Sequence, residues 1–273
     1  MIYLGTLGRM VGIKCPSSQS LEMDEKYFFE TSVEGKRQAQ LKPIQRRTWG
    51  IGTSDATTPA QAAALEAFAN GEWGPGPFVF VSADAPVTNL LDPAASICDL
   101  SAYTFGLNTE ITAGGPVATL DGWAGQSYMN TGATGSIFFG RYKIPVLPGQ
   151  PVTGAAYVRG QDSYVALSFY DINGNAIGTP RASTVKGMGA TMTRSFITVT
   201  PPAGAVSCML SAWNTVQSAR PSITWTSDLL DWSTGQGCPM AVVHNVGREL
   251  IMATAEKSGG RYSRLSYTAT EVG

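Results

Sequence analysis

Apolar and polar residues alternate over short runs along most of this chain, and glycine, proline or asparagine separates the runs. In residues 1–91 the runs are rich in aromatic and β-branched residues, which favour strands. They are "IYLGTLG" (2–8), "RMVGIKC" (9–15), "KYFFETSVEG" (26–35) and "RRTWGIGT" (46–53). This pattern predicts a first block built from several short strands.

One segment of the first block follows a helical period instead. Thr58-Pro59-Ala60-Gln61 is a capping box with proline at the first helical position, so a helix is predicted to start there. Ala64, Leu65, Phe68 and Ala69 share one face at helical spacing, and Asn70-Gly71 supplies the stop. The sequence therefore predicts one short amphipathic helix packed against a sheet.

From 92 to 235 helical periodicity is weak, and strand-like runs follow one another with turn signals between them. Asn173-Gly174 lies between apolar runs, as in a tight hairpin, and Pro201–Gly204 forces another turn. Many short strands with frequent turns predict a β-sandwich or jelly roll. The segment is therefore expected to be a domain of its own.

Residues 236–273 return to longer runs, which predict three further strands: "PMAVVHNVG", "RELIMATAE" and "GGRYSRLSYTATEVG". Three strands are too few for an independent domain, so we expect them to pair with the first block. The predicted fold is mainly β. It has a discontinuous outer domain (1–91 and 236–273) with one short helix, and an inserted jelly roll (92–235).

Composition narrows the classes of partner. The net charge of −1 and the scattered basic residues give no footprint for nucleic acid. Apolar runs fall short of a membrane span, and the N-terminus lacks the pattern of a secretory signal, so we expect folding in a cytosol without membrane insertion. The four cysteines, Cys15, Cys98, Cys208 and Cys238, have no metal spacing and are expected to be buried thiols. Cys98 and Cys238 flank the middle segment, although a cytosolic origin argues against a disulfide.

Signals for catalysis are weak. His244 is the only histidine and lies in an apolar run without a nucleophile elbow. The aspartates of the middle segment fit turns and strand ends better than a pair across a cleft. We therefore expect no enzymatic activity, no cofactor and no metal.

The middle segment resembles the family 4/9 carbohydrate-binding modules, which are jelly rolls. The resemblance rests on pieces in the family's order: "TNLL", "GGPVATL", "PVLPGQPVTGAAYVRG", "VALSFYDINGNAIG", "TRSFITVTPPAGAVSCML" and "PSITWTSDLL". It implies that the segment binds sugar, although this fold is reused for many functions.

Sugar binding needs an exposed aromatic platform with polar neighbours. Candidate residues for such a platform are Trp123, Tyr128, Tyr170, Trp213 and Trp232, with Asp121, Gln126, Asp171 and Asn214 as polar partners. The alternative for each aromatic ring is a place in the sandwich core. Alternation with Ile223 favours the core for Trp225. Loop-type neighbours strengthen the case for binding at Trp123 and Trp213, although the core remains the favoured alternative for both.

The outer block resembles the distal tail proteins, and related minor tail proteins, of long-tailed bacteriophages (siphophages) with actinobacterial hosts. The resemblance rests on "VEGKRQAQLKP", "RRTWGIG", "TPAQAAALEAFANGEWGPGPF", "FVFVSADAPVTNLL" and the return from 238 to 273. It implies a virion protein of the tail tip or baseplate, assembled in the host cytoplasm as a hexameric ring between the tail tube protein and the tail hub or tip protein. The inserted domain would then face outward for host attachment, with host surface polysaccharide as a further partner.

Arginine and aromatic residues on the outer strands are candidates for the ring interface, because both are enriched in interfaces. They are Arg46, Arg47, Trp49, Arg261, Tyr262 and Arg264. Ordinary strand faces are the alternative for each of them. For the whole chain, the alternatives are a stand-alone carbohydrate-binding protein and a minor tail protein that forms no ring.

Overall fold

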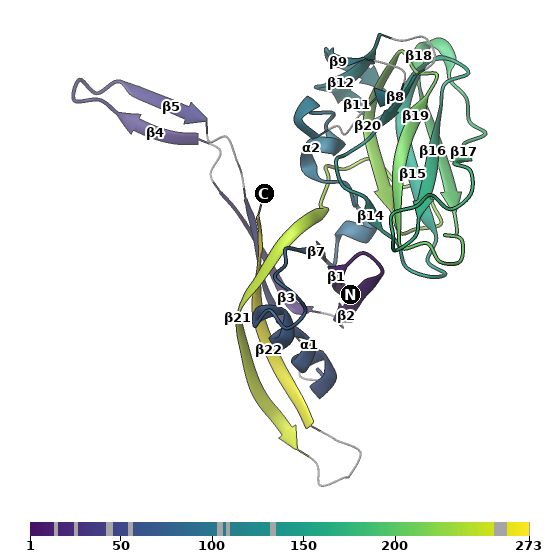
Figure 1. Ribbon diagram of the computed structural model, residues 1–273. Helices are drawn as coiled ribbons and strands as arrows, with labels where there is room; N and C mark the ends of the chain where they lie inside the picture. The colour runs from purple at the N-terminus through teal and green to yellow at the C-terminus, as the bar shows by residue number, and fades with distance from the viewer. Residues whose placement is uncertain are drawn as a thin grey trace. The chain divides into compact units, whose positions relative to one another are not determined.

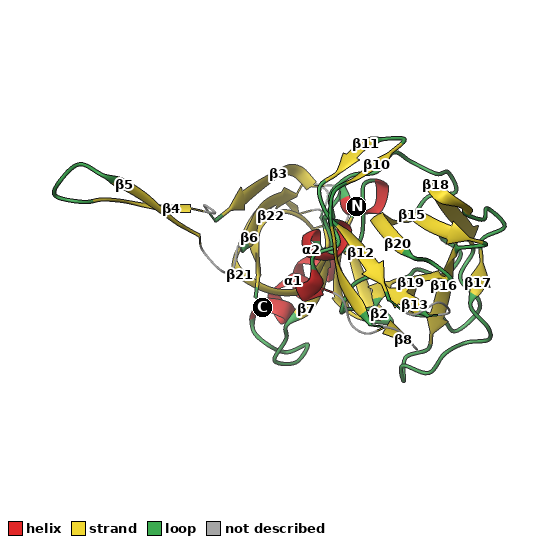
Figure 2. Ribbon diagram, turned by 90° about the horizontal axis from the view of Figure 1, so that it is seen from above, coloured by secondary structure: helices red, strands yellow, loops and turns green. Residues whose placement is uncertain are grey.

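The computed structural model describes residues 1–13, 16–24, 27–41, 46–53, 57–102, 106–107, 110–131, 135–253 and 261–272. Strands dominate the described chain (Figure 2), so the mainly β prediction is confirmed. The chain forms two compact units. The first contains Met1–Leu4, Val11–Phe80 and Met240–Gly273, and the second contains Gly5–Met10 and Val81–Pro239. The boundaries expected at 92 and 235 stay a prediction about independent folding.

A seven-stranded sheet in the order β2-β1-β7-β21-β22-β6-β3 forms most of the first unit. Its strands are β1 (Ile2–Thr6), β2 (Arg9–Ile13), β3 (Pro16–Met23), β6 (Arg47–Thr53), β7 (Phe78–Val81), β21 (Cys238–Ala253) and β22 (Arg261–Glu271). The order places β21 and β22 between β7 and β6. The C-terminal strands therefore complete the sheet of the first block, as their small number requires.

The return segment forms two long strands rather than three. "PMAVVHNVG" and "RELIMATAE" belong to one strand, β21, so Gly247 makes no turn. The register against β22 shifts between His244 and Gly247, and Asn245 has a positive φ of 54°. A β-bulge thus absorbs the extra residues and bends the strand without ending it.

Helix α1 (Pro59–Ala69) starts as predicted, with Thr58 as its N-cap. The Gln61 amide donates to the Thr58 hydroxyl at 3.4 Å, and the Gln61 side chain accepts from the Thr58 amide at 3.4 Å. Ala62, Leu65 and Phe68 are its buried residues, whereas Ala69, which was expected on that face, is exposed. Trp73 stacks on Phe68 with ring centroids 4.8 Å apart and fixes the turn after the helix.

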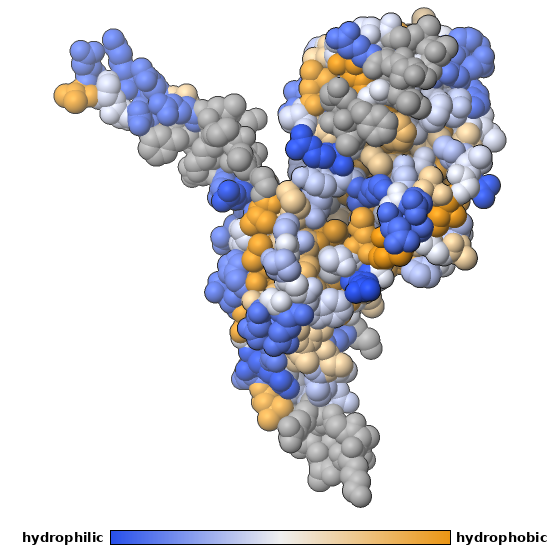
Figure 3. Space-filling view, in the orientation of Figure 1, coloured by the Kyte–Doolittle hydropathy of each residue, from blue (hydrophilic) through white to orange (hydrophobic). Residues whose placement is uncertain are grey.

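Strands β4 (Tyr27–Thr31) and β5 (Arg37–Leu41) form a separate two-stranded hairpin. Every side chain described in it is exposed, Phe29 at 52%. The hairpin surface is mostly hydrophilic (Figure 3). Within the described chain, β4 and β5 pair only with each other.

Two sheets face each other in the second unit as a β-sandwich jelly roll (Figure 1). One sheet has the order β18-β15-β20-β12-β9, and the other has the order β17-β16-β19-β13-β8, with β14 beside β19. The first sheet contains β9 (Ile111–Gly114), β12 (Ser127–Asn130), β15 (Val152–Gln161), β18 (Met188–Val199) and β20 (Gln217–Thr224). The second contains β8 (Gly106–Leu107), β13 (Ser136–Phe138), β14 (Ile144–Pro145), β16 (Tyr164–Tyr170), β17 (Arg181–Ala182) and β19 (Ser207–Trp213).

Two sequence predictions for the sandwich are confirmed: the core position of Trp225 and the turn at Asn173-Gly174. Trp225 is 5% exposed and donates its indole N–H to the Pro145 carbonyl at 3.1 Å, as a core tryptophan should. Asn173-Gly174 lies in a tight turn closed by the bridge between Tyr170 and Ala176. Short helices that the sequence pattern did not reveal precede the strands: η1 (Ala85–Val87), α2 (Pro93–Ser96) and η2 (Leu100–Ala102).

The two ends of the sandwich segment lie side by side. The Gln236 amide donates to the Asn89 carbonyl at 2.8 Å, and the Gly237 amide donates to the Leu91 carbonyl at 2.9 Å. The fully buried Asn89 side chain donates to the carbonyls of Pro221 and Ser233.

Cys98, Cys208 and Cys238 are buried and form no disulfide, while Cys15 lies outside the described residues.

Candidate functional site

The two-stranded ribbon of β10 (Val117–Thr119) and β11 (Gly122–Ala124) presents an exposed tryptophan. Alternation along β11 turns Ala124 inward, where it packs in a buried cluster with Tyr157 and Ala219. The neighbouring residue, Trp123, faces the opposite way and is 72% exposed. Ala124 thus anchors the ribbon, and the large ring of Trp123 is left in solvent.

A β-bulge in β20 supplies the residue that holds this ribbon. Between the pairs Ala155–Ser222 and Tyr157–Ala219, two residues of β20 lie opposite one residue of β15. Arg220 is one of these two and has a φ of +50°, a rare conformation for a residue with a side chain. Bulges change the direction of side chains in this way, often beside binding sites.

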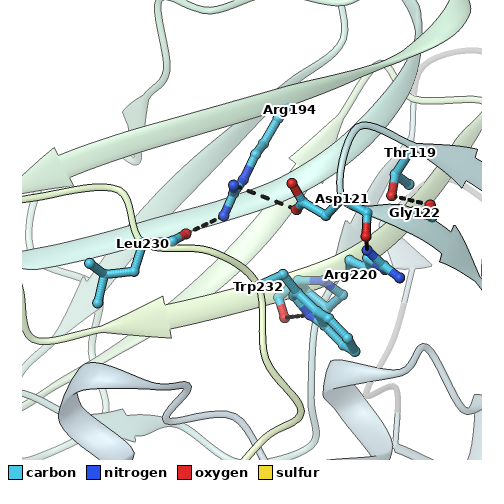
Figure 4. Close-up of polar contacts among 8 residues, drawn as sticks. Thr119, Asp121, Gly122, Arg194, Arg220, Leu230 and Trp232 are labelled. Atoms are coloured by element: carbon cyan, nitrogen blue, oxygen red, sulfur yellow. Dashed lines mark hydrogen bonds and ion pairs between the residues drawn. The ribbon is translucent and has the colours of Figure 1, made fainter.

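The Arg220 guanidinium joins three parts of the site (Figure 4). It donates to the Asp121 carbonyl and to the Trp123 carbonyl, each at 2.8 Å. It also lies over the Trp232 ring, 4.7 Å from the centroid, in a cation–π contact. Arg220 therefore fixes the backbone on both sides of Gly122 and brings Trp232 to the same place as Trp123.

A second arginine neutralises the nearest carboxylate. Asp121 forms an ion pair with Arg194 at 3.5 Å, and Arg194 also donates to the Leu230 carbonyl (Figure 4). Tyr157 lies beneath this pair, with the Arg194 guanidinium 5.8 Å from its ring centroid. Burial, and then the neighbouring Asp121 carboxylate, raise the pKa of the Tyr157 phenol to about 12.

A pocket of about 250 Å³ lies beside Trp123, Arg220 and Trp232. Its walls come from α2's C-terminal turn, the ribbon, the bulge and the segment after β20, through Ile97, Trp123, Ala124, Gly125, Gln126, Arg220 and Trp232. Two indole rings, a guanidinium and an amide thus meet in one open pocket. This combination suits a ligand with an apolar face and hydroxyl edges.

Of the nine residues predicted for sugar binding, the structure brings Trp123, Gln126 and Trp232 together, with Asp121 beside them. Tyr128 was a wrong choice for an exposed platform. It is fully buried, and its hydroxyl donates to the Asp99 carbonyl at 2.6 Å. Its ring packs near Phe139, as β12 turns this position toward the core.

The other candidates lie on the second sheet. Trp213 pairs with Tyr164 across β19 and β16, their rings nearly parallel at 6.5 Å, and Asn214 follows it in an exposed turn. Tyr170 lies at the opposite end of β16, where Lys143 lies 3.9 Å from its ring centroid. These residues line none of the pocket around Trp123.

Two of the residues predicted for a ring interface are in the core of the first unit instead. Trp49 is 1% exposed and packs against Phe80 at 4.9 Å. Arg47 is 5% exposed and forms a two-bond ion pair with Glu271, each bond 2.8 Å long. Alternation in β6 turns both inward, so they stabilise the fold and are not free for a partner.

The remaining interface candidates are on the surface or outside the description. Arg46 and Arg264 are exposed, Tyr262 is 37% exposed, and Arg264 pairs with Glu249 at 3.5 Å. The side chain of Arg261 lies outside the described residues.

Sequence reasoning missed Arg220 and Arg194. One local signal for Arg220 was available, because Pro221 follows it within an otherwise central strand. Proline there cannot donate to a ladder and marks a bulge. Arg194 carried no such signal, since its role depends on the pairing of β18 with β15.

His244, the only histidine in the sequence, lies in the first unit. His244 contacts the Thr270 hydroxyl at 2.9 Å in the β21–β22 pair. Over the described residues, no three side chains among histidine, cysteine, aspartate and glutamate gather as a metal site. No described helix has the length and apolar character needed to span a membrane.

Several solved structures are similar to this chain. The enzymatically active domain of tailspike protein 4 of bacteriophage CBA120 matches over 52% of this chain and 22% of its own, at 15% identity and a TM-score of 0.41. The CBM22-1–GH10 modules of Clostridium thermocellum xylanase 10B, solved with xylohexaose, match over 54% and 29%, at 12% identity and 0.37. The module CBM6cm-2 of Cellvibrio mixtus lichenase 5A, solved with cellotriose, matches over 46% and 93%, at 15% identity and 0.31.

This chain spans less than a third of the length of the tailspike and xylanase chains. Because all three TM-scores are below 0.5, these similarities do not establish a shared function. No protein-family model and no curated protein matches the sequence.

Proposed function

We propose that the second unit binds a glycan by stacking a sugar ring on Trp123, with Trp232, Arg220 and Gln126 around it. One observation carries the proposal: Trp123 is 72% exposed, yet its own carbonyl is held by Arg220. An exposed tryptophan on a rigid backbone loses little conformational freedom when a ligand covers it. A pyranose offers the apolar face that such a ring binds, and its hydroxyls match the amide and guanidinium beside it.

The wider role that we propose is that of a structural protein of a bacteriophage tail tip, and not an enzyme. Support comes from the resemblance of the outer block to distal tail proteins and from the β4–β5 hairpin. An isolated two-stranded hairpin is marginally stable, so exposed β4–β5 side chains favour a neighbouring subunit that covers them. In a closed ring each copy would present one weak glycan site beside those of its neighbours, and avidity would raise the combined affinity.

A stand-alone carbohydrate-binding protein is the second function that the Trp123 pocket supports. The two functions share the glycan site and differ in assembly. A chain that remains monomeric at high concentration, alone and with a tail tube protein, favours the stand-alone function.

The glycan site is tested with Trp123→Ala in the full-length chain, on an array of bacterial surface glycans. We expect binding of the parent chain and a loss of at least about tenfold in affinity for the variant, because base stacking on one aromatic ring is of the order of 1–3 kcal/mol and sugar stacking is expected to be similar. Trp213→Ala is the matched control, since Trp213 lies on the other sheet. Binding that survives Trp123→Ala and disappears with Trp213→Ala would move the site to the Tyr164–Trp213 pair.

A further inference from the structure

We propose that the ligand of this site is an acidic polysaccharide, bound as a chain across Trp123 with one anionic group near Arg220 and another near Arg159. The inference rests on the proposed glycan site. It adds the chemical class of the ligand and the path of the glycan chain across Trp123.

Trp123 lines two depressions, not one. Besides the pocket shared with Trp232, it forms a wall of a groove of about 500 Å³. The groove is lined by Pro116–Leu120, Trp123, Arg159 and Ala190–Met192. A single sugar fits one side of the indole, whereas a chain that crosses it reaches both depressions. The geometry therefore favours an oligosaccharide over a monosaccharide.

Each depression has one arginine and no carboxylate in its lining. The nearest carboxylate, that of Asp121, already pairs with Arg194 at 3.5 Å. Among the described residues neither Arg159 nor Arg220 has an ion-pair partner, and the Nε of Arg220 is buried without a hydrogen bond. Positive charge is thus left unpaired at this site in a chain whose net charge is −1.

Irregular pairing fixes both arginines in place. Arg220 lies in the bulge of β20, and Arg159 lies where the register of β15 against β18 shifts between Val158 and Gly160. The Arg159 carbonyl accepts from the Val216 amide at 2.7 Å and from the Thr215 hydroxyl at 3.2 Å. The sheet therefore fixes the backbone of both arginines, and each arginine lines one of the two depressions that share Trp123.

A partly buried guanidinium without a counter-ion binds an anionic ligand more strongly than a neutral one. Hydrogen bonds between guanidinium and carboxylate or phosphate are charge-assisted and about twice as strong as neutral ones. A neutral glycan leaves both charges uncompensated, so carboxylate or phosphate groups along the chain add affinity and selectivity.

Direct binding measurements on the full-length chain, by calorimetry and on a glycan array, test the inference. The probes are polygalacturonate oligomers, the same oligomers with every carboxyl methyl-esterified, and phosphomannan oligomers, which carry phosphate on sugar rings. We expect at least one acidic probe to bind about tenfold more tightly than the esterified oligomers. The affinity for that probe should fall as the salt concentration rises. Which acidic probe binds distinguishes carboxylate from phosphate. Affinity should rise with chain length beyond one sugar.

Variants separate this inference from the glycan site itself. Arg159→Gln should weaken binding of the acidic probe several-fold more than binding of the neutral probe, while Arg181→Gln, an exposed charge on β17, should change neither affinity. Neutral glycans that bind as well as or better than acidic ones, with Trp123→Ala still abolishing binding, overturn the acidic ligand and leave the glycan site standing. An array without any bound glycan contradicts both.

Discussion

Arg220 has a backbone conformation that few residues other than glycine adopt, and the structure compensates for it. A positive φ at such a residue costs on the order of 1 kcal/mol. Two hydrogen bonds to carbonyls of the ribbon and a contact with Trp232 offset this cost. The strained residue thus orders the backbone that carries an exposed aromatic ring, and an outlier of this kind motivates the hypothesis of a functional site.

Tyr157 should make the second unit sensitive to alkaline pH. Its pKa is raised from 10.0 to about 12, because burial and Asp121 disfavour the phenolate. A group whose pKa is raised on folding stabilises the folded state. For Tyr157 this stabilisation is complete below pH 10, where the phenol is protonated in both the folded and the unfolded chain. That contribution is lost as pH rises from 10 to about 12, by at most about 1.4 kcal/mol per pH unit. Thermal melting of the second unit, followed at several pH values, measures this slope.

Tyr157→Phe is the control, because it keeps the buried ring and removes the titrating group. The variant should lose stability less steeply between pH 10 and pH 12 than the parent chain. Equal slopes for the two chains would show that Tyr157 titrates normally.

At the scale of elements, the β10–β11 ribbon depends on a single glycine. Gly122 has a φ of +102°, whereas Gly125 has no such conformation, and an added Cβ would meet no atom within 4 Å at either position. Gly122→Ala therefore tests backbone strain alone, of the order of 1–2 kcal/mol. We expect it to shift Trp123 and weaken glycan binding several-fold.

Gly125→Ala is the matched variant for the same measurement of glycan affinity and melting temperature. It should keep its stability within about 0.5 kcal/mol, since it adds no backbone strain. Because Gly125 lines the pocket, some loss of affinity is expected, but a smaller loss than in Gly122→Ala. Equal losses in the two variants would mean that the pocket rejects any added methyl group, and that the conformation of Gly122 does not position Trp123.

At the scale of the whole molecule, the two ends of the sandwich segment are close enough to be joined. The amides of Gln236 and Gly237 donate to the carbonyls of Asn89 and Leu91. Removing 92–235 and joining 91 to 236 should therefore leave a folded outer unit that forms the same oligomer as the full chain. Circular dichroism and light scattering measure the two outcomes.

A second deletion that joins Phe80 to Met240 follows the compact units and removes Leu90 and Leu91, which are buried among sandwich residues. If only this variant folds, the domain boundary lies near 81 and 239. If neither folds, the outer unit depends on the sandwich, and the prediction of two independent domains is wrong.

Local chemistry made several features readable from the sequence alone. The capping box of α1, the turn at Asn173-Gly174 and the core position of Trp225 depend on neighbours a few residues away. The mainly β fold also followed, since alternation and frequent turns specify strands and hairpins directly. Alternation could not tell which face of β12 is buried, so Tyr128 was misplaced.

The sequence by itself therefore determined the strands, the helix start and the turns, because short-range sterics and hydrogen bonds decide these. Only the tertiary structure decided where the exposed tryptophan lies and what surrounds it. Trp123, Arg159, Arg220 and Trp232 come from four separate segments, and a bulge in the pairing of β15 with β20 directs Arg220 to the ribbon. The pairing of distant strands sets such a meeting, and the one local signal, Pro221, marks the bulge without showing which residues Arg220 contacts.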